Sequence, residues 1–145
     1  MNGQYTYAYK QEGTDASSEI AWTGGYNGWG VQLTDKTSTD AVTSKLCTYI
    51  NNKPITSMKY MFYKSQATTL DLSSFDTSNV TSMFNMFSNS QATTLDVSKF
   101  DTSKVTDMGY MFNSSETTEI KGLNKFNTSN VTYMSSMFES SKATT

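Results

Sequence analysis

Histidine is absent from this 145-residue sequence, and Cys47 is its only cysteine. Without histidine, the many hydroxyl side chains lack the usual general base that activates a nucleophile, so we expect no enzyme. The same absences remove the commonest ligands of transition metals, and we expect no metal site and no cofactor. A single cysteine excludes an internal disulfide, and its apolar neighbours favour a buried small residue over a reactive thiol.

A surplus of charge of one sign is also lacking. Lysine and arginine total 11, aspartate and glutamate total 13, and the formal net charge is −2. This balance excludes the strongly basic surface that binds nucleic acid or an anionic membrane. Long apolar runs are absent as well, so we expect neither insertion into a membrane nor a signal peptide within these residues.

What the sequence has instead is a repeat. Met-x-x-Met-Phe occurs four times, at intervals of 25, 25 and 26 residues. Serine and threonine make up 44 residues, a composition that alone would suggest disorder or a mucin-like stalk. A fixed period of this length instead predicts stacked units, each of which buries its apolar side against its neighbours. The four copies are Met58–Phe62, Met83–Phe87, Met108–Phe112 and Met134–Phe138.

Apolar residues recur in register outside this motif too, and we expect these columns to form the core. The repeats extend over residues 54–145, as about four units. The extra residue of the last interval falls at Gly122, which predicts a bulge. The predicted core columns consist of Leu70, Leu72, Phe75, Val80, Met83, Met86, Phe87, Leu95, Val97, Phe100, Val105, Met108, Met111 and Phe112.

Two periodicities alternate within each unit. Residues 69–73 alternate polar and apolar side chains, as in a half-buried strand. Val80, Met83 and Phe87 have helical spacing, and Ser78 precedes them at the position of an N-cap. The predicted fold class is an α/β solenoid, leucine-rich-repeat-like, in which stacked strand–short helix units follow an N-terminal capping module.

Residues 1–53 do not follow the repeat and form the predicted capping module. Alternation predicts strands over residues 5–9 and 29–33, and helical spacing predicts a helix over Asp40–Asn51. A stack of repeats needs such a cover at its open end. The aromatic residues of this segment admit two interpretations, a capping core or a sugar-stacking surface, and we favour the capping core. They are Tyr5, Tyr7, Tyr9, Trp22, Tyr26 and Trp29.

The other end of the repeat region shows no such cover. Lys142–Thr145 matches Gln91–Thr94, which leads directly into the next strand pattern. We therefore expect an open C-terminal coil, which either belongs to a longer array or pairs with another molecule.

The methionine pairs allow a sharper hypothesis. Thioether sulfur is a soft ligand, and methionines three residues apart can bind Cu(I). The second methionine of each pair is followed by phenylalanine, however, and both lie on or beside the apolar side of the unit. We therefore interpret the pairs as core residues, since flexible methionine side chains fill irregular gaps.

Outward positions of the stacked strands form polar ladders. A flat and repetitive face of this kind suits an extended partner, whereas the competing interpretation is a solvated face that only keeps the protein soluble. An ice-binding surface is not favoured, since the outward pair is threonine then aspartate rather than two threonines. The candidate binding face consists of Thr69, Asp71, Ser73, Thr94, Asp96, Ser98, Glu119 and Lys121.

A second set of acidic residues resembles a calcium turn. Asp76 and Asp101 each precede Thr-Ser, and repeated acidic turns bind calcium in some repeat proteins. Asn127 takes their place in the third copy, and only one carboxylate occurs per turn. A role in turns or caps explains all three residues without a metal.

One family matches these columns. The run Leu-Asp-Leu-Ser-Ser-Phe-Asp-Thr-Ser-Asn-Val-Thr-Ser-Met from Leu70 to Met83, followed by Met86-Phe87, resembles the repeat of BspA-like bacterial surface proteins. The resemblance covers about residues 54–145 and implies a leucine-rich-repeat-like array on the cell surface. Some members are implicated in adhesion to host matrix proteins or to other cells. The family's lipid-anchoring cysteine and wall-sorting tail are absent from this sequence.

These patterns predict an extracellular or cell-surface adhesion module whose partner is a protein or glycan on a host or neighbouring cell. The localisation, cell surface or secreted, follows from the resemblance. The alternative is a structural spacer or self-assembling element, such as part of a phage-encoded surface or fibre protein, which has no ligand and associates end to end through its C-terminal coil. Adhesion predicts that reversing the charge of Asp96 abolishes binding, whereas the spacer interpretation predicts no functional change.

Overall fold

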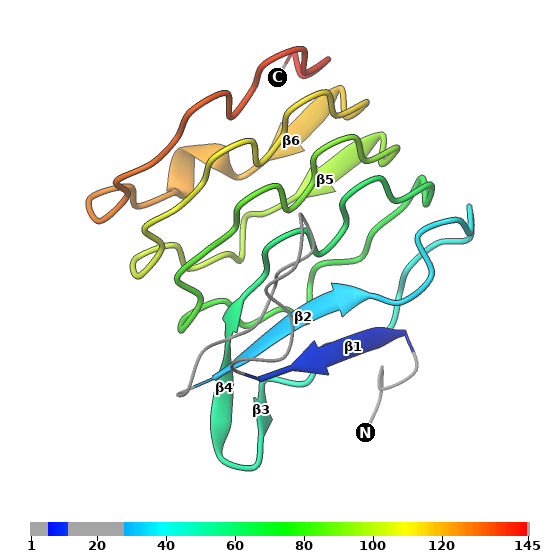
Figure 1. Cartoon of the computed structure of the whole chain (residues 1–145). Coiled ribbons are helices and arrows are strands. Elements are labelled where there is room, and N and C mark those ends of the chain that lie inside the picture. Colours follow the sequence, from blue (N-terminus) through cyan, green and yellow to red (C-terminus); the bar gives the residue numbers. More distant parts are fainter. Residues whose placement is uncertain (1–5, 12–27, 145) are drawn as a thin grey trace.

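The computed structural model describes residues 6–11 and 28–144, and its regular elements are short (Figure 1). Four strands form one sheet in the order β1-β2-β4-β3, in which β2 and β4 run parallel and the two outer pairs are antiparallel. β5 and β6 form a separate parallel pair. The elements are β1 (Tyr7–Lys10), β2 (Trp29–Leu33), β3 (Tyr49–Ile50), β4 (Lys53–Ser57), β5 (Thr94–Asp96), β6 (Glu119–Lys121) and the 3-10 helix η1 (Leu123–Lys125).

Beyond β4 the chain winds into four layers that lie one above another (Figure 1). Each layer contains one Met-x-x-Met-Phe segment, and we number the layers 1 to 4 from Met58–Phe62 to Met134–Phe138. Parallel bridges join residues one repeat apart, from Ser57 to Ser82, from Ser82 to Asp107 and from Asp107 to Tyr133. The period of the sequence is therefore the length of chain needed to return to the same place in the next layer.

The predicted α/β solenoid of strand–short helix units is wrong, because the part of the chain that the structure describes contains no α-helix. Short strands, bridges and turns form a curled mixed sheet instead. Where a helix was expected in layer 2, three overlapping tight turns occur, and the N–H of Ser88 closes the middle one on the carbonyl of Asn85 (3.3 Å). The N–H of Met86 donates to the carbonyl of Met83 (3.1 Å), and the N–H of Ser90 donates to the carbonyl of Phe87 (3.1 Å). Turns closed from i to i+3 repeat apolar side chains at nearly the helical spacing.

These turns hold non-glycine residues in the left-handed region. Such residues are uncommon, and type II turns place them at the third position. The conformation directs alternate N–H groups toward the next layer, where Asn85 donates to the carbonyl of Gly109 (3.0 Å) and Phe87 to that of Met111 (2.9 Å). Two positions of every layer are affected, with φ between 54° and 61°: Tyr60, Lys64, Asn85, Asn89, Tyr110, Ser114, Ser136 and Ser140.

The interlayer bonds of these segments all point one way. From Met58 to Lys64, four alternate N–H groups donate to carbonyls of layer 2, and layers 2 and 3 repeat the pattern toward layers 3 and 4. Each segment therefore presents a row of donors on the side facing the higher-numbered layer, which we term the donor edge, and a row of carbonyls on its other side. Backbone pairing across layers satisfies the peptide groups that a helix would have satisfied internally.

The apolar columns fill the space inside the layers. Phenylalanine rings of successive layers stack with centroids 5.6, 5.5 and 5.3 Å apart, from Phe62 through Phe87 and Phe112 to Phe138. Each fully buried side chain of this kind contributes about 1.5–3 kcal/mol through removal from water. The fourteen predicted core residues all have at most 7% of their surface exposed: Leu70, Leu72, Phe75, Val80, Met83, Met86, Phe87, Leu95, Val97, Phe100, Val105, Met108, Met111 and Phe112.

The segment before the repeats differs from expectation in one element. The helix predicted over Asp40–Asn51 is wrong, because Val42 forms a parallel bridge with Leu70 and Tyr49–Ile50 forms β3. β1 and β2 lie where the alternation of the sequence predicted strands.

Aromatic side chains of this segment pack on the first layer of the stack. Tyr7 is fully buried, meets Phe75 edge-on at 6.1 Å and donates its hydroxyl to the carbonyl of Ser44 (2.9 Å). The indole N–H of Trp29 donates to the carbonyl of Ile50 (2.9 Å), and Tyr9 packs partly buried against the core. The remaining predicted aromatic positions, Tyr5, Trp22 and Tyr26, lie outside the described residues.

The extra residue of the last repeat is absorbed by a turn rather than by the predicted bulge. Gly122 adopts φ 93° and begins the 3-10 helix η1. A Cβ atom here would lie 2.4 Å from Cα of Ser98 in the layer below, so both the backbone conformation and the space require glycine.

Candidate binding face

The predicted ladder lies on the side of the stack that carries β5 and β6. The register of this pair sets Thr94 beside Glu119 and Asp96 beside Lys121, with Leu95 and Ile120 between them pointing into the core. Of the predicted face, Ser98 and Glu119 are half-buried, and the other members are exposed: Thr69, Asp71, Ser73, Thr94, Asp96 and Lys121.

Each aspartate of the ladder is held by the serine two residues further on. Asp71 accepts hydrogen bonds from the hydroxyl (2.6 Å) and the N–H (3.0 Å) of Ser73, and Asp96 accepts the same pair from Ser98. The serine hydroxyl first and its N–H second lower the pKa of both carboxyl groups, because they favour the charged form. Lys99 near Asp71 acts in the same direction. The ladder is therefore a row of fixed carboxylates that stay ionised.

The layers part along one section of this face. In the described chain, Leu70 pairs with Val42 but has no bridge to Leu95. The ring centroids of Phe75 and Phe100, further along the same two layers, are 6.5 Å apart, more than any pair of the Phe62 column. A slot of about 120 Å³ opens there, with a wall from each of the two layers: Leu70, Asp71, Leu72, Ser73, Asp96, Ser98 and Lys99. The slot brings together four members of the predicted face.

A second row of the same turns follows at the next corner of each layer. Asp101 accepts the hydroxyl (2.6 Å) and N–H (3.0 Å) of Ser103, and Asn127 accepts the corresponding pair from Ser129 at 2.7 and 3.0 Å. Because the asparagine amide oxygen does the same work as the carboxylate, the turn needs no charge and no calcium. Among the described residues, no group of three or more His, Cys, Asp or Glu side chains could hold a metal ion.

The candidate metal and thiol residues are inside the core. Both methionines of layers 1 to 3 are fully buried and belong to one apolar cluster with the phenylalanine column. Cys47 is also buried, and its N–H donates to the hydroxyl of Tyr9 (3.3 Å).

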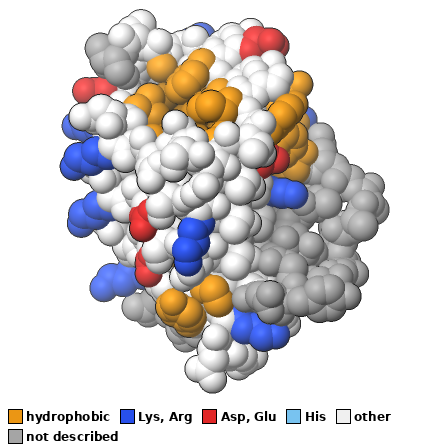
Figure 2. Space-filling view, turned by 90° about the vertical axis from the view of Figure 1, so that its left-hand side faces the viewer, with side chains coloured by type: hydrophobic (Ala, Val, Ile, Leu, Met, Phe, Trp, Pro, Cys, Tyr) orange, Lys and Arg blue, Asp and Glu red, His pale blue; other side chains and the backbone are white. Residues whose placement is uncertain are grey.

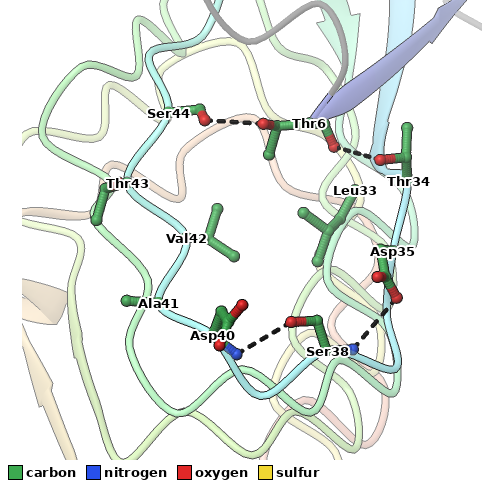
Figure 3. A pocket seen from close by; sticks show the side chains of 10 residues that line it. All are labelled: Thr6, Leu33, Thr34, Asp35, Ser38, Asp40, Ala41, Val42, Thr43 and Ser44. Atoms are coloured by element: carbon green, nitrogen blue, oxygen red, sulfur yellow. Dashed lines mark hydrogen bonds between the residues drawn. The ribbon is translucent and has the colours of Figure 1, made fainter.

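A separate pocket of about 240 Å³ opens beside β2, near the start of the repeat region (Figure 3). Leu33 and Val42 face each other across it, with Asp40 at one rim. The hydroxyls of Thr6 and Ser44 bond each other (2.8 Å), and the hydroxyl of Thr34 donates to the carbonyl of Thr6 (2.9 Å). The polar lining is thus largely engaged with itself.

Layer 4 ends the described stack and leaves apolar side chains in contact with solvent. Tyr133, Met134 and Phe138 are 42%, 45% and 45% exposed. Figure 2 shows hydrophobic side chains gathered at this end of the molecule, with acidic and basic side chains interspersed below them.

One surface feature escaped the sequence analysis. Five aromatic side chains on the Met-x-x-Met-Phe side of the stack contact one another from layer to layer, and we term them the aromatic strip: Tyr60, Tyr63, Phe84, Tyr110 and Tyr133. They are spread over four columns of the repeat, and only Tyr60 and Tyr110 share one, so no alignment of the copies shows them as a set. The signal that could have found them is Gly109, the one glycine in a Met-x-x-Met-Phe motif.

Layers built from one recurring unit and joined by backbone hydrogen bonds make this a repeat protein. The chain belongs to the family described as Mycoplasma protein of unknown function, DUF285, which matches residues 35–145. This match agrees with a surface-associated repeat family and does not identify BspA-like leucine-rich repeats. No curated protein and no solved structure matches the chain. Within the described residues, no helix is long and apolar enough to cross a membrane.

Proposed function

We propose that this protein is a binding module displayed at a cell surface, and that the ladder of Asp71, Asp96 and Lys121 contacts its partner. The observation that carries the proposal is the slot, because it opens on that ladder and is flanked by carboxylates already fixed by Ser73 and Ser98. Fixed groups lose little conformational entropy when a partner binds. The partner class is a protein or a glycan outside the cell, in keeping with a surface-associated family.

The test is a binding screen of the folded chain against extracellular-matrix proteins and a glycan array. Asp96→Lys reverses the charge at this position and places a second positive charge beside Lys121. We expect the variant to bind the partner about tenfold more weakly or worse, since a surface whose charge is reversed no longer complements that of the partner. Asp101→Lys is the matched control, because it removes the same kind of turn from the neighbouring row. Asp96→Asn keeps the turn, as Asn127 does, and separates the effect of charge from that of geometry.

If Asp96→Lys binds as well as the unchanged protein, the ladder is not part of the interface. Loss of binding in Asp101→Lys alone would move the interface to the second row of turns.

The structural spacer is the second candidate, favoured by the exposed apolar side chains of layer 4. Tyr133, Met134 and Phe138 present a surface suited to another layer rather than to water. The spacer predicts association that grows with protein concentration, measured by sedimentation, and no ligand in the screen. Met134→Ser together with Phe138→Ser should then abolish the association.

A further inference from the structure

The aromatic strip runs across the layers as a continuous row. Tyr60 meets Tyr63 at 5.3 Å and Phe84 at 5.7 Å, and Phe84 meets Tyr110 at 5.8 Å, each nearly edge to face. Phe84 also meets Tyr133 at 6.3 Å, with the planes tilted by 38°. The core phenylalanines, by contrast, stack with nearly parallel planes and no exposure in layers 1 to 3. Four of the strip residues are half-buried, and the fifth, Tyr133, is 42% exposed.

The fold does not require aromatic side chains at these positions. Each strip position is occupied by a small or polar residue in some other layer, although the backbone of all layers follows the same path. The column of Tyr60 and Tyr110 also contains Asn85 and Ser136, the column of Phe84 contains Lys59 and Ser135, and that of Tyr133 contains Ser57 and Ser82. Serine at the last two of these sites even keeps the interlayer bridge. Something other than packing of the repeat accounts for five aromatic residues that meet.

Gly109 makes the row continuous. A Cβ atom at this position would lie 2.2 Å from the ring of Tyr133, closer than carbon atoms approach one another, and in a tight contact of 3.1 Å with the ring of Phe84. Any other residue would therefore push Tyr133 away from Phe84 and break the strip between layers 2 and 4. The N–H of Gly109 donates to the carboxylate of Asp107 (2.9 Å), which holds the backbone at this gap.

The polar groups beside the strip indicate an uncharged, hydroxyl-rich ligand. Asn85 lies between Tyr60 and Tyr110 in their column, and its side-chain amide forms no hydrogen bond with the described residues. An amide offers one acceptor and a two-proton donor, which together match a hydroxyl group that both donates and accepts. Charges of both signs lie near the rings: Lys64 lies over Tyr63, Lys59 shares the column of Phe84, and Asp107 lies at Gly109. Scattered charges of both signs do not form the basic patch that attracts a polyanion, and heparin tests this point directly.

We propose that the aromatic strip and Asn85 bind a neutral polysaccharide, which lies along the row of rings across the layers. Tyrosine supplies a rigid apolar body with a polar tip, the combination suited to the apolar and hydroxylated parts of a sugar. The row favours a linear chain over a compact ligand, because each of the four layers contributes at least one aromatic ring to it. This inference rests on the proposed binding function and assigns the glycan to a face different from the aspartate ladder.

The experiment is affinity electrophoresis of the folded chain in gels that contain mixed-linkage β-glucan, xylan or dextran, with heparin as the charged comparison. The two test variants borrow residues from equivalent positions: Tyr110→Asn, as at Asn85, and Tyr133→Ser, as at Ser82. Asparagine also accepts the left-handed conformation of Tyr110, φ 56°, without added strain. The matched control is Tyr49→Ser, which removes a 54% exposed tyrosine from β3. A thermal melt by circular dichroism establishes that each variant is folded.

We expect retardation by at least one neutral polysaccharide, an affinity about tenfold weaker in each test variant, and no change in Tyr49→Ser. Asn85→Gly, which removes the side-chain amide and accepts the left-handed conformation of this position (φ 57°), should weaken binding with an unchanged melt. No retardation in any neutral gel overturns the proposal, as does retardation by heparin alone or retardation that both test variants retain.

The binding screen separates this outcome from failure of the proposed function. A protein ligand lost in Asp96→Lys, together with no polysaccharide binding, would retain the binding module and reject the strip. Polysaccharide binding that is lost in the strip variants but kept in Asp96→Lys, together with no ligand lost in Asp96→Lys in the screen, would retain the strip and reject the ladder.

Discussion

Replacement of Phe87 by alanine tests how the stacked rings stabilise the layers. Phe87 is fully buried, and its ring lies between those of Phe62 and Phe112, 5.6 and 5.5 Å away with interplanar angles of 7°. Removal of a buried phenylalanine lowers the free energy of unfolding by about 3–5 kcal/mol. A single domain has a total of about 5–15 kcal/mol, so this one change should remove a large fraction of the stability.

Phe138 provides a matched control in the same column. Its ring stacks on Phe112 at 5.3 Å, but the side chain is 45% exposed and no second ring among the described residues stacks on it. Because about half of the side chain is already in water, Phe138→Ala should lower the free energy of unfolding by roughly 1.5–2.5 kcal/mol.

Equilibrium unfolding in urea, followed by far-ultraviolet circular dichroism, measures both changes. The free energy follows from the midpoint and the slope, and an unchanged slope shows that the same surface unfolds. A loss in Phe138→Ala that equals or exceeds the loss in Phe87→Ala would refute the reasoning, because enclosure between two layers would then not determine the contribution of a ring.

Three further predictions concern the surface and the first strand. Gly109→Ala should lower the melting temperature slightly, as overpacking costs about 1–3 kcal/mol, and should change the near-ultraviolet dichroism as Tyr133 is displaced. The pKa of Asp101 is lowered in the folded protein by its serine hydroxyl and N–H, so its stabilising effect is complete above the unfolded pKa of about 3.9 and is lost as the pH falls through the folded pKa. Asp101→Asn, which copies Asn127, should therefore flatten the fall of melting temperature below about pH 4, and an unchanged acid profile would contradict this. Burial raises the pKa of Tyr7, so the stability that its neutral form contributes is complete below about pH 10 and is lost as the pH rises further. In a titration followed by tyrosinate absorbance, Tyr7→Phe should therefore lack one of the tyrosines that ionise at the highest pH.

Burial in this protein could be read from the sequence more easily than backbone conformation. Two columns show this, one with Val80 and Val105 and the other with Met83 and Met108. Their side chains are buried in a turn as they would be in a helix, because apolar residues that recur at a fixed period share one environment. The spacing of apolar residues within one unit does not distinguish a helix from consecutive i to i+3 turns. The deciding feature is positive φ, and Tyr60 is not a residue type that indicates it.

The two candidate sites differ in the same way. Asp71 and Asp96 lie in one column, so comparison of the copies predicts this ladder. The slot beside it could not be predicted, because it forms where two layers separate in the folded structure. The aromatic strip arises from Tyr60, Phe84 and Tyr133 in three different columns, which meet only because the layers are stacked and Gly109 leaves room. Contacts between columns depend on side-chain direction, which a linear comparison of repeats does not contain.

The donor edge gives the stack a direction. Two copies that met through equivalent edges about a two-fold axis would oppose N–H with N–H, so an isologous pair is disfavoured along the Met-x-x-Met-Phe segments. A layer fits only in one sense, with its carbonyl row over the donor row of the layer before it. A whole repeat can therefore be duplicated or deleted between layers 2 and 3 without changing the pattern of backbone bonds that joins the Met-x-x-Met-Phe segments. In evolution, the number of layers in such a protein can change by whole repeats, whereas the direction in which the N–H groups of each layer point stays the same.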